Sequence, residues 1–122
     1  MKEVIIVGVG GFFGSAGRYA VSLISSSYFP QKPYLGTIIV NLIGCLLIGL
    51  ISGGLIKSSQ QQLGLLLMTG VCGGFTTFSA FALDGLKMIK EGVPSLFLIY
   101  YGISVIGGLL LCWLGFNIMA KG

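Results

Sequence analysis

The residues that could do chemistry are polar side chains set at helical spacing inside strongly apolar stretches. Thr37 and Asn41 are four residues apart, as are Tyr100 and Ser104, so each pair lies on one face of a helix. Hydroxyl and amide groups donate hydrogen bonds without carrying a full charge. They can donate hydrogen bonds one after the other to an anion that moves along the helix. Alternatively, they can bond neighbouring helices together at about 0.6 kcal/mol per bond. The spacing alone leaves both interpretations open.

Two phenylalanines could serve the same purpose through a different interaction. Phe78 and Phe81 are three residues apart and also share a helix face. The edge of an aromatic ring is electropositive, so a pair of ring edges can contact a small anion. This contact is weaker than binding to a buried Lys or Arg, and conduction requires that an ion can leave its site. The alternative is that both rings only pack against neighbouring helices.

Few charged groups lie within the apolar stretches. Arg18 is the clearest, and it either extends to the membrane interface or gives an entrance vestibule a positive potential. Asp84 and Lys87 are three residues apart near the end of an apolar stretch, where we expect an interfacial ion pair. The chain has no histidine, and its three cysteines lie apart in apolar runs. Histidine acid–base chemistry is thereby excluded, and the thiols are interpreted as small buried apolar groups.

The elements that carry these side chains are four apolar segments. The chain has 122 residues, of which 55% are hydrophobic and 8% are charged, and its mean hydropathy is +1.01. A soluble domain carries about 25% charged residues, so this chain could not cover itself in water. The polar stretches between the segments, including S-S-S-Y-F-P-Q-K-P after the first, are expected to be turns. We predict one all-α membrane domain, residues 1–122, with four transmembrane helices at approximately Val4–Ile24, Leu35–Ile56, Leu63–Ile89 and Ser95–Met119.

The third segment contains an unusual run at residues 69–79, T-G-V-C-G-G-F-T-T-F-S. Glycine costs roughly 1 kcal/mol relative to alanine in a helix interior, and threonine is stiff at χ1. In lipid, a broken helix is tolerated where the freed backbone groups are buried, line a cavity or hold an ion. The run therefore predicts a third helix that is broken near Thr76, at the bilayer midplane.

Glycine spacing predicts where helices approach one another closely. Pairs of small residues four apart form the faces on which membrane helices pack. Three such pairs are Gly10 and Gly14, Gly49 and Gly53, and Gly70 and Gly74.

Basic residues are spread evenly between the two sides of the predicted bundle. One side carries Lys2, Lys57 and Lys121 and the other Lys32, Lys87 and Lys90, so Arg18 alone breaks the tie. Membrane orientation follows the Lys/Arg bias, which is almost nil here. We therefore expect a chain that inserts both ways up and forms an antiparallel homodimer, with one fixed orientation as the alternative. The basic residues show none of the clustering typical of nucleic-acid binding.

Three stretches together resemble the signature sequences of the Fluc (CrcB-type) fluoride channels. They are G-G-F-F-G-S-A-G-R-Y (Gly10–Tyr19), G-T-I-I-V-N-L-I-G (Gly36–Gly44) and G-V-C-G-G-F-T-T-F-S-A-F (Gly70–Phe81). The resemblance covers all four segments, and T-T-F-S-x-F is its most specific part. It implies an antiparallel, dual-topology dimer with two fluoride pores in the cell membrane of a microbe. Such channels let fluoride leave the cytoplasm passively, without an enzymatic step.

The resemblance also implies roles for individual residues. Phe78 and Phe81 would be the aromatic box that lines the pore, and Asn41 the adjacent pore amide. Thr37 would line the pore, and Arg18 would lie at its vestibule.

A sodium ion is implied in the same way. The family holds it at the dimer interface with main-chain carbonyls of the broken third helix, and the matching positions are Gly73 and Thr76 of each subunit.

The chain departs from the family pattern at a few positions. On the last helix, Tyr100 and Ser104 match the polar track of the family, but the next turn offers Gly108 in place of a second hydroxyl. Ser15 replaces the usual alanine, and Asp84 stands where the family often has glutamate. Because both phenylalanines and Asn41 are kept, a homodimer is favoured over a heterodimer with a paralogue.

The expected function is therefore a fluoride channel. Its rival is a proton-coupled exporter of the small multidrug resistance type, which also has four spans and dual topology. Such an exporter needs a carboxylate deep in the membrane, whereas Asp84 lies near the end of its segment. A purely structural assembly subunit would explain the glycine pairs but not the row of polar side chains.

Overall fold

The computed structural model describes residues 1–56 and 58–121, and Lys57, expected in the turn between the second and third segments, lies outside them. Within this part every regular element is helical. Four helical segments are long and apolar enough to cross a membrane, Lys2–Tyr28, Tyr34–Leu55, Gln61–Lys90 and Pro94–Lys121, which confirms the predicted four long apolar helices. The elements in chain order are α1 (Lys2–Tyr28), α2 (Tyr34–Leu55), α3 (Gln61–Gly64), η1 (Leu65–Cys72), α4 (Gly73–Phe75), α5 (Phe78–Lys90), α6 (Pro94–Gly102), η2 (Ile103–Gly107) and α7 (Gly108–Lys121), η marking π-helix.

The end of α1 differs from the prediction. The helix continues through the S-S-S-Y stretch to Tyr28, although that stretch was expected to be a turn. Ser25 is only 6% exposed, because it packs beside Gly36 of α2, and this contact stabilises the extra helical turn. The helix ends where Pro30 follows Phe29, since a residue before proline is driven out of the helical region and Phe29 has φ −133°.

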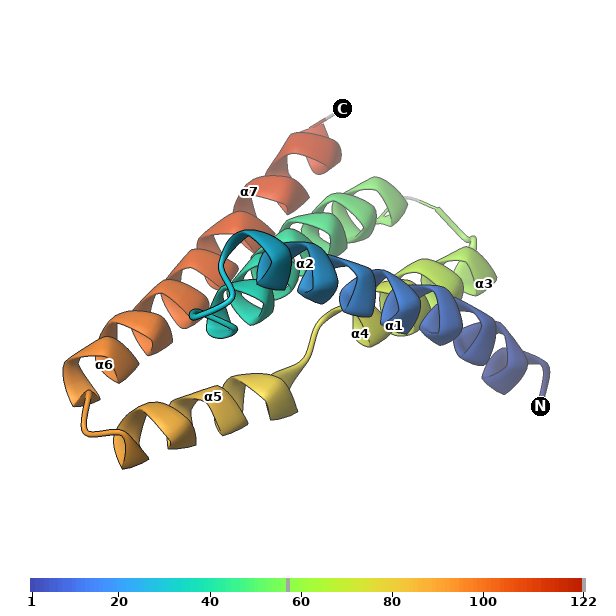
Figure 1. Ribbon diagram of the computed structural model, residues 1–122. Helices are drawn as coiled ribbons and strands as arrows, with labels where there is room; N and C mark the ends of the chain where they lie inside the picture. Colours follow the sequence, from blue (N-terminus) through green and yellow to red (C-terminus); the bar gives the residue numbers. More distant parts are fainter. Residues whose placement is uncertain (57, 122) are drawn as a thin grey trace.

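Close helix packing forms two groups of helices. α2 packs along α7, while α1 packs on η1 and α4 (Figure 1). Gly49 and Gly53 of α2 face the carbonyls of Cys112 and Phe116, and a Cβ at either glycine would overlap that carbonyl. In Figure 1 the N-terminus lies at the lower right and the C-terminus at the top, and the α5–α6 connection lies at the lower left.

The contact between α1 and η1–α4 is a contact of main chains. A Cβ at Gly10 would lie 2.9 Å from the Cα of Gly70, and one at Gly74 would lie 2.8 Å from the carbonyl oxygen of Gly11. A Cβ at Gly14 would overlap the carbonyl of Val71. The close approach predicted for the glycine pairs is confirmed.

The backbone changes course at Thr76 and Thr77, which we call the Thr76–Thr77 segment. Thr76 has φ −89° and ψ 158°, and Thr77 has φ −149° and ψ 118°, so both are extended. The segment follows the π-helical η1 and the short α4, and π-helical turns are often found at functional sites. Beyond it, α5 runs apart from α1 and packs mainly on α6 and α2 (Figure 1).

Most of the apolar surface is not buried within one copy of the chain. The accessible surface is 7801 Å², whereas a compact soluble chain of this mass would expose roughly 6,300 Å². Among the described residues the buried apolar side chains are Val40, Cys72, Met88 and Tyr100. Lipid or a partner chain must cover the rest, which is consistent with a multi-pass membrane protein.

Candidate functional site

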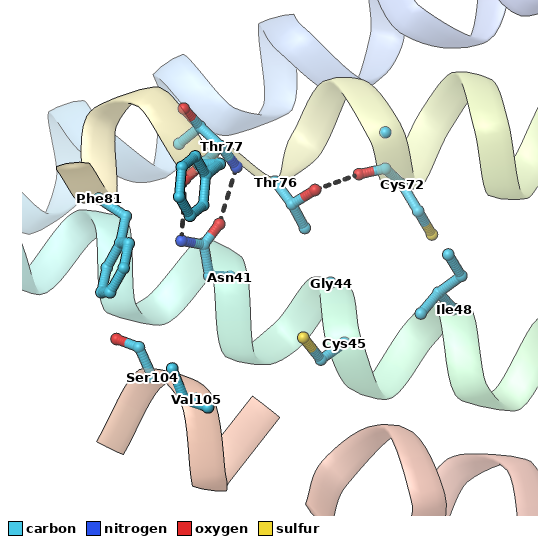
Figure 2. Close-up of a pocket in the computed structure, with 12 residues that line it drawn as sticks. Asn41, Gly44, Cys45, Ile48, Cys72, Thr76, Thr77, Phe81, Ser104 and Val105 are labelled. Carbon is cyan, nitrogen blue, oxygen red and sulfur yellow. Dashed lines mark hydrogen bonds between the residues drawn. The ribbon is translucent and has the colours of Figure 1, made fainter. Parts of the chain in front are cut away.

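A cavity of about 380 Å³ lies between α2, the end of η1, the start of α5 and η2 (Figure 2). The Thr76–Thr77 segment forms one wall, and the π-helical segment η2 forms the opposite one. Most of the lining is apolar, and a few amide, hydroxyl and carbonyl groups are set into it. The lining residues are Asn41, Gly44, Cys45, Ile48, Cys72, Gly73, Thr76, Thr77, Phe78, Phe81, Ser104 and Val105.

Asn41 binds the main chain of Thr77 with both ends of its amide (Figure 2). Its Oδ1 accepts from the N–H of Thr77 at 2.8 Å, and its Nδ2 donates to the carbonyl of Thr77 at 3.1 Å. The extended backbone of Thr77 makes this pairing possible, because its N–H has no helical acceptor. One N–H of the amide is left for another partner.

Thr77 also begins α5. Its hydroxyl accepts from the N–H of Ala80 at 3.1 Å, which is the usual hydrogen bond of an N-cap threonine. Asn41 therefore fixes the residue from which the helix carrying Phe78 and Phe81 starts. The two rings lie 5.8 Å apart between centroids with an interplanar angle of 48°.

Thr76 is held in one side-chain orientation. Its hydroxyl donates to the carbonyl of Cys72 at 2.9 Å, and its N–H donates to the same carbonyl at 3.0 Å. Its methyl group lies against Gly44 of α2, where any Cβ would overlap it. These contacts hold the side chain of Thr76 at the edge of the cavity.

The main-chain carbonyls around this segment differ in their partners. Arg18 donates from Nε to the carbonyl of Gly74 at 3.1 Å, and Asn41 occupies that of Thr77. Within residues 1–56 and 58–121, no hydrogen bond is found to the carbonyls of Gly73 and Thr76. These two residues line the cavity with acceptors that a cation could use.

Ser104 supplies a free donor on the opposite wall. Its Oγ is buried, and it has no hydrogen-bond partner in the described part of the chain. It comes from η2, where i→i+5 bonding widens the turn, so Ser104 does not lie directly above Tyr100 as it would in an α-helix. A buried hydroxyl without a partner costs stability, and because Ser104 lines the cavity its donor is available to a group there.

Not all of the predicted site residues meet at the cavity. Asn41, Phe78, Phe81, Ser104, Gly73 and Thr76 line it, whereas Thr37, Tyr100 and Arg18 do not.

Tyr100 is 2% exposed, and its ring contacts Phe81 at 5.1 Å between centroids. Its hydroxyl donates to Oδ2 of Asp84 at 3.0 Å. The expected ion pair between Asp84 and Lys87 is wrong, since the one ion pair found among the described residues joins the amino group of Met1 to Glu3. Asp84 instead accepts from the buried phenol.

Comparison with known proteins identifies the family of this chain. Residues 5–116 match the family described as CrcB-like protein, Camphor Resistance (CrcB). The chain belongs to the CrcB-like family.

Relatives of the chain carry a more specific name. A protein of Methylobacillus flagellatus called fluoride-specific ion channel FluC is 40% identical over 98% of this chain and 95% of its own length. A protein of the same name from Azotobacter vinelandii is 42% identical over 91% of each chain. One from Pseudomonas putida is 39% identical over 94% of each chain.

Sequence reasoning missed two residues of this CrcB-like site. Thr77 was not singled out, although a threonine three residues before Ala80 at the start of an apolar helix is an N-cap signal. Gly44 was quoted only within a stretch, and its role depends on Thr76 packing against it from 32 positions away. Helical spacing within one segment carries no signal for such a contact.

Proposed function

We propose that this CrcB-like chain is a fluoride channel of the cell membrane that lets fluoride leave the cytoplasm down its electrochemical gradient. The observation that carries the proposal is the apolar cavity with a buried, unpartnered Ser104 hydroxyl opposite Asn41. The relatives named as fluoride-specific channels support the choice of ion. No bond of the ion is made or broken, so the chain is not an enzyme.

The cavity suits a small, strongly hydrated anion. The Ser104 hydroxyl and the second N–H of Asn41 are neutral donors that replace part of its water without trapping it. The ring edges of Phe78 and Phe81 pass the ion through the apolar part. Thr37 and Tyr100 extend this path beyond the cavity, with Tyr100 linked to Phe81 by ring contact.

We propose an antiparallel homodimer with two such pores. Phe78 is 79% exposed in one copy, and a pore residue in this state requires a second chain to enclose it. The balanced placement of basic residues lets the chain insert both ways up. In this assembly the Thr76–Thr77 segment is the break of the third span, at the bilayer midplane. A heterodimer with a paralogue is the alternative, distinguished by whether the purified chain alone conducts.

A sodium ion at the dimer interface fits the carbonyls present. Gly73 and Thr76 offer oxygen ligands without hydrogen-bond partners, and each copy would contribute the same two. Hard cations prefer such oxygen ligands. The bound ion would supply positive charge that holds the two Thr76–Thr77 segments together.

Fluoride efflux from liposomes tests the proposal. Purified protein should release fluoride but not chloride, with or without a proton gradient. Dependence on the proton gradient would favour the small multidrug resistance type of exporter, and vesicles that retain fluoride would refute the channel.

Phe81→Ile should cut efflux at least tenfold while crosslinking still yields a dimer, because an aliphatic group has no electropositive edge. Unchanged efflux in this variant would refute the ring-edge role.

A further inference from the structure

Arg18 contacts Gly74, two residues before the Thr76–Thr77 segment, and does not line the cavity. Its Nε donates to the carbonyl of Gly74 at 3.1 Å, a contact between residues 56 positions apart. Gly74 stands next to Gly73, for whose carbonyl no hydrogen-bond partner is found in the described part of the chain. An arginine within a membrane span usually pairs with a carboxylate or a main-chain carbonyl, because leaving it unpaired is costly.

The position of Arg18 is fixed by the packing of its own helix. One turn earlier, Gly14 lets the backbone of α1 touch Val71 and Phe75, and a Cβ at Gly14 would lie 2.8 Å from the nitrogen of Phe75. Gly17 packs against the ring of Phe75, 3.5 Å from a Cβ built there. Three positions on one face of α1 therefore hold the end of the helical run Gln61–Phe75.

Arg18 of α1 and Asn41 of α2 both bond to main-chain carbonyls between Gly74 and Thr77. Arg18 occupies the carbonyl of Gly74, and Asn41 occupies that of Thr77. The carbonyls of Gly73 and Thr76 remain for a ligand. Two side chains from α1 and α2 thus remove the carbonyls of Gly74 and Thr77 from those available to a ligand.

We propose that Arg18 is a positioning residue for the cation site of this chain. By holding the carbonyl of Gly74 it keeps that group out of the site and fixes the direction of the Gly73 carbonyl beside it. This inference rests on the sodium site of the proposed function. It differs from a vestibule role, in which only the positive charge of Arg18 matters.

The two roles predict opposite effects on the cation. The charge of Arg18 repels sodium, so removing it would strengthen sodium binding if charge were all that mattered. Loss of the hydrogen bond to Gly74 loosens the carbonyls and weakens sodium binding. Arg18→Met removes both features, and Arg18→Lys keeps the charge but loses the donor at Nε.

The test measures thermal unfolding of the detergent-purified dimer as sodium replaces N-methylglucamine. We expect the sodium concentration for half-maximal stabilisation to rise at least threefold in Arg18→Met, where the lost repulsion offsets part of the effect, and at least as much in Arg18→Lys, which keeps the charge. Lys32→Met is the matched control, since it also removes one positive charge but lies in the exposed α1–α2 connection. It should match the wild type.

The outcomes separate this inference from the function on which it rests. An unchanged or lower half-saturating concentration in Arg18→Met overturns the positioning role, while fluoride efflux by the wild type would still stand. If Arg18→Met yields no folded protein, Arg18→Lys decides alone, and a wild-type value there overturns the inference. A wild-type protein that does not respond to sodium overturns both the cation site and the role of Arg18.

Discussion

Replacing Asn41 with alanine removes the pairing that holds Thr77. Two hydrogen bonds of 2.8 and 3.1 Å are lost, and the N–H of Thr77 is left without an acceptor in a partly buried place. Each bond contributes about 1 kcal/mol net, and an orphaned buried donor costs about 1–3 kcal/mol. Asn41→Ala should therefore lower the free energy of unfolding by about 2–4 kcal/mol.

A comparison with aspartate separates the structural role of Asn41 from its contact with the anion. Asn41→Asp keeps an acceptor for the N–H of Thr77, so it should lose only about half as much stability as Asn41→Ala. Its carboxylate, however, faces the cavity and repels an anion there. We therefore expect Asn41→Asp to be more stable than Asn41→Ala but to conduct less fluoride.

The assays are denaturant unfolding in detergent and fluoride efflux from liposomes. Asn117→Ala is the matched control, because Asn117 also bonds a carbonyl through Nδ2, that of Trp113 at 2.9 Å, but at an exposed site. It should change the free energy of unfolding by less than about 1 kcal/mol. A stability of Asn41→Ala within about 0.5 kcal/mol of the wild type would refute the proposed hold on Thr77.

Two further substitutions test other walls of the cavity. Gly44→Ala places a Cβ on the methyl group of Thr76, so both fluoride efflux and stabilisation by sodium should fall severalfold, whereas Gly8→Ala meets nothing within 4 Å in one copy and should leave both unchanged. Equal effects of the two alanines would contradict the Thr76 contact. Ser104→Ala should cut efflux severalfold without loss of stability, because its hydroxyl has no partner to lose. Ser25→Ala, which removes another unpartnered buried hydroxyl far along α1, should leave efflux intact, and parallel behaviour of the two serines would count against an anion at Ser104.

The architecture could be read from the sequence because lipid imposes simple rules on it. Apolar runs of sufficient length predict spans, and glycines four apart predict close contacts, which the packing of Gly10 on Gly70 confirms. The end of α1 was misjudged because three serines resemble a turn, although Ser25 can be buried beside Gly36 in a helix.

The candidate site was predictable only in part. Residue types marked Asn41 and Ser104 as polar groups that need an explanation, and both line the cavity. Helical spacing placed Tyr100 and Ser104 on one face, but only Ser104 lines the cavity. The π-turns of η2 change the angle around the helix axis between the two side chains. The bonds from Asn41 to Thr77 and from Tyr100 to Asp84 join different helices, so residue spacing within one segment cannot predict them.

The glycine contacts between α1 and η1–α4 have a consequence for how the protein can vary. Where two main chains touch, no choice of rotamer makes room for a larger residue, so any substitution at Gly10, Gly14 or Gly70 must move a whole helix. The side chains that α1 exposes in one copy, such as Phe12, meet no such limit within the chain and can vary among apolar types. In a library of all single substitutions selected for survival in fluoride, the glycine positions on the packed face of α1 should not vary. The exposed positions on its other face should accept many apolar residues.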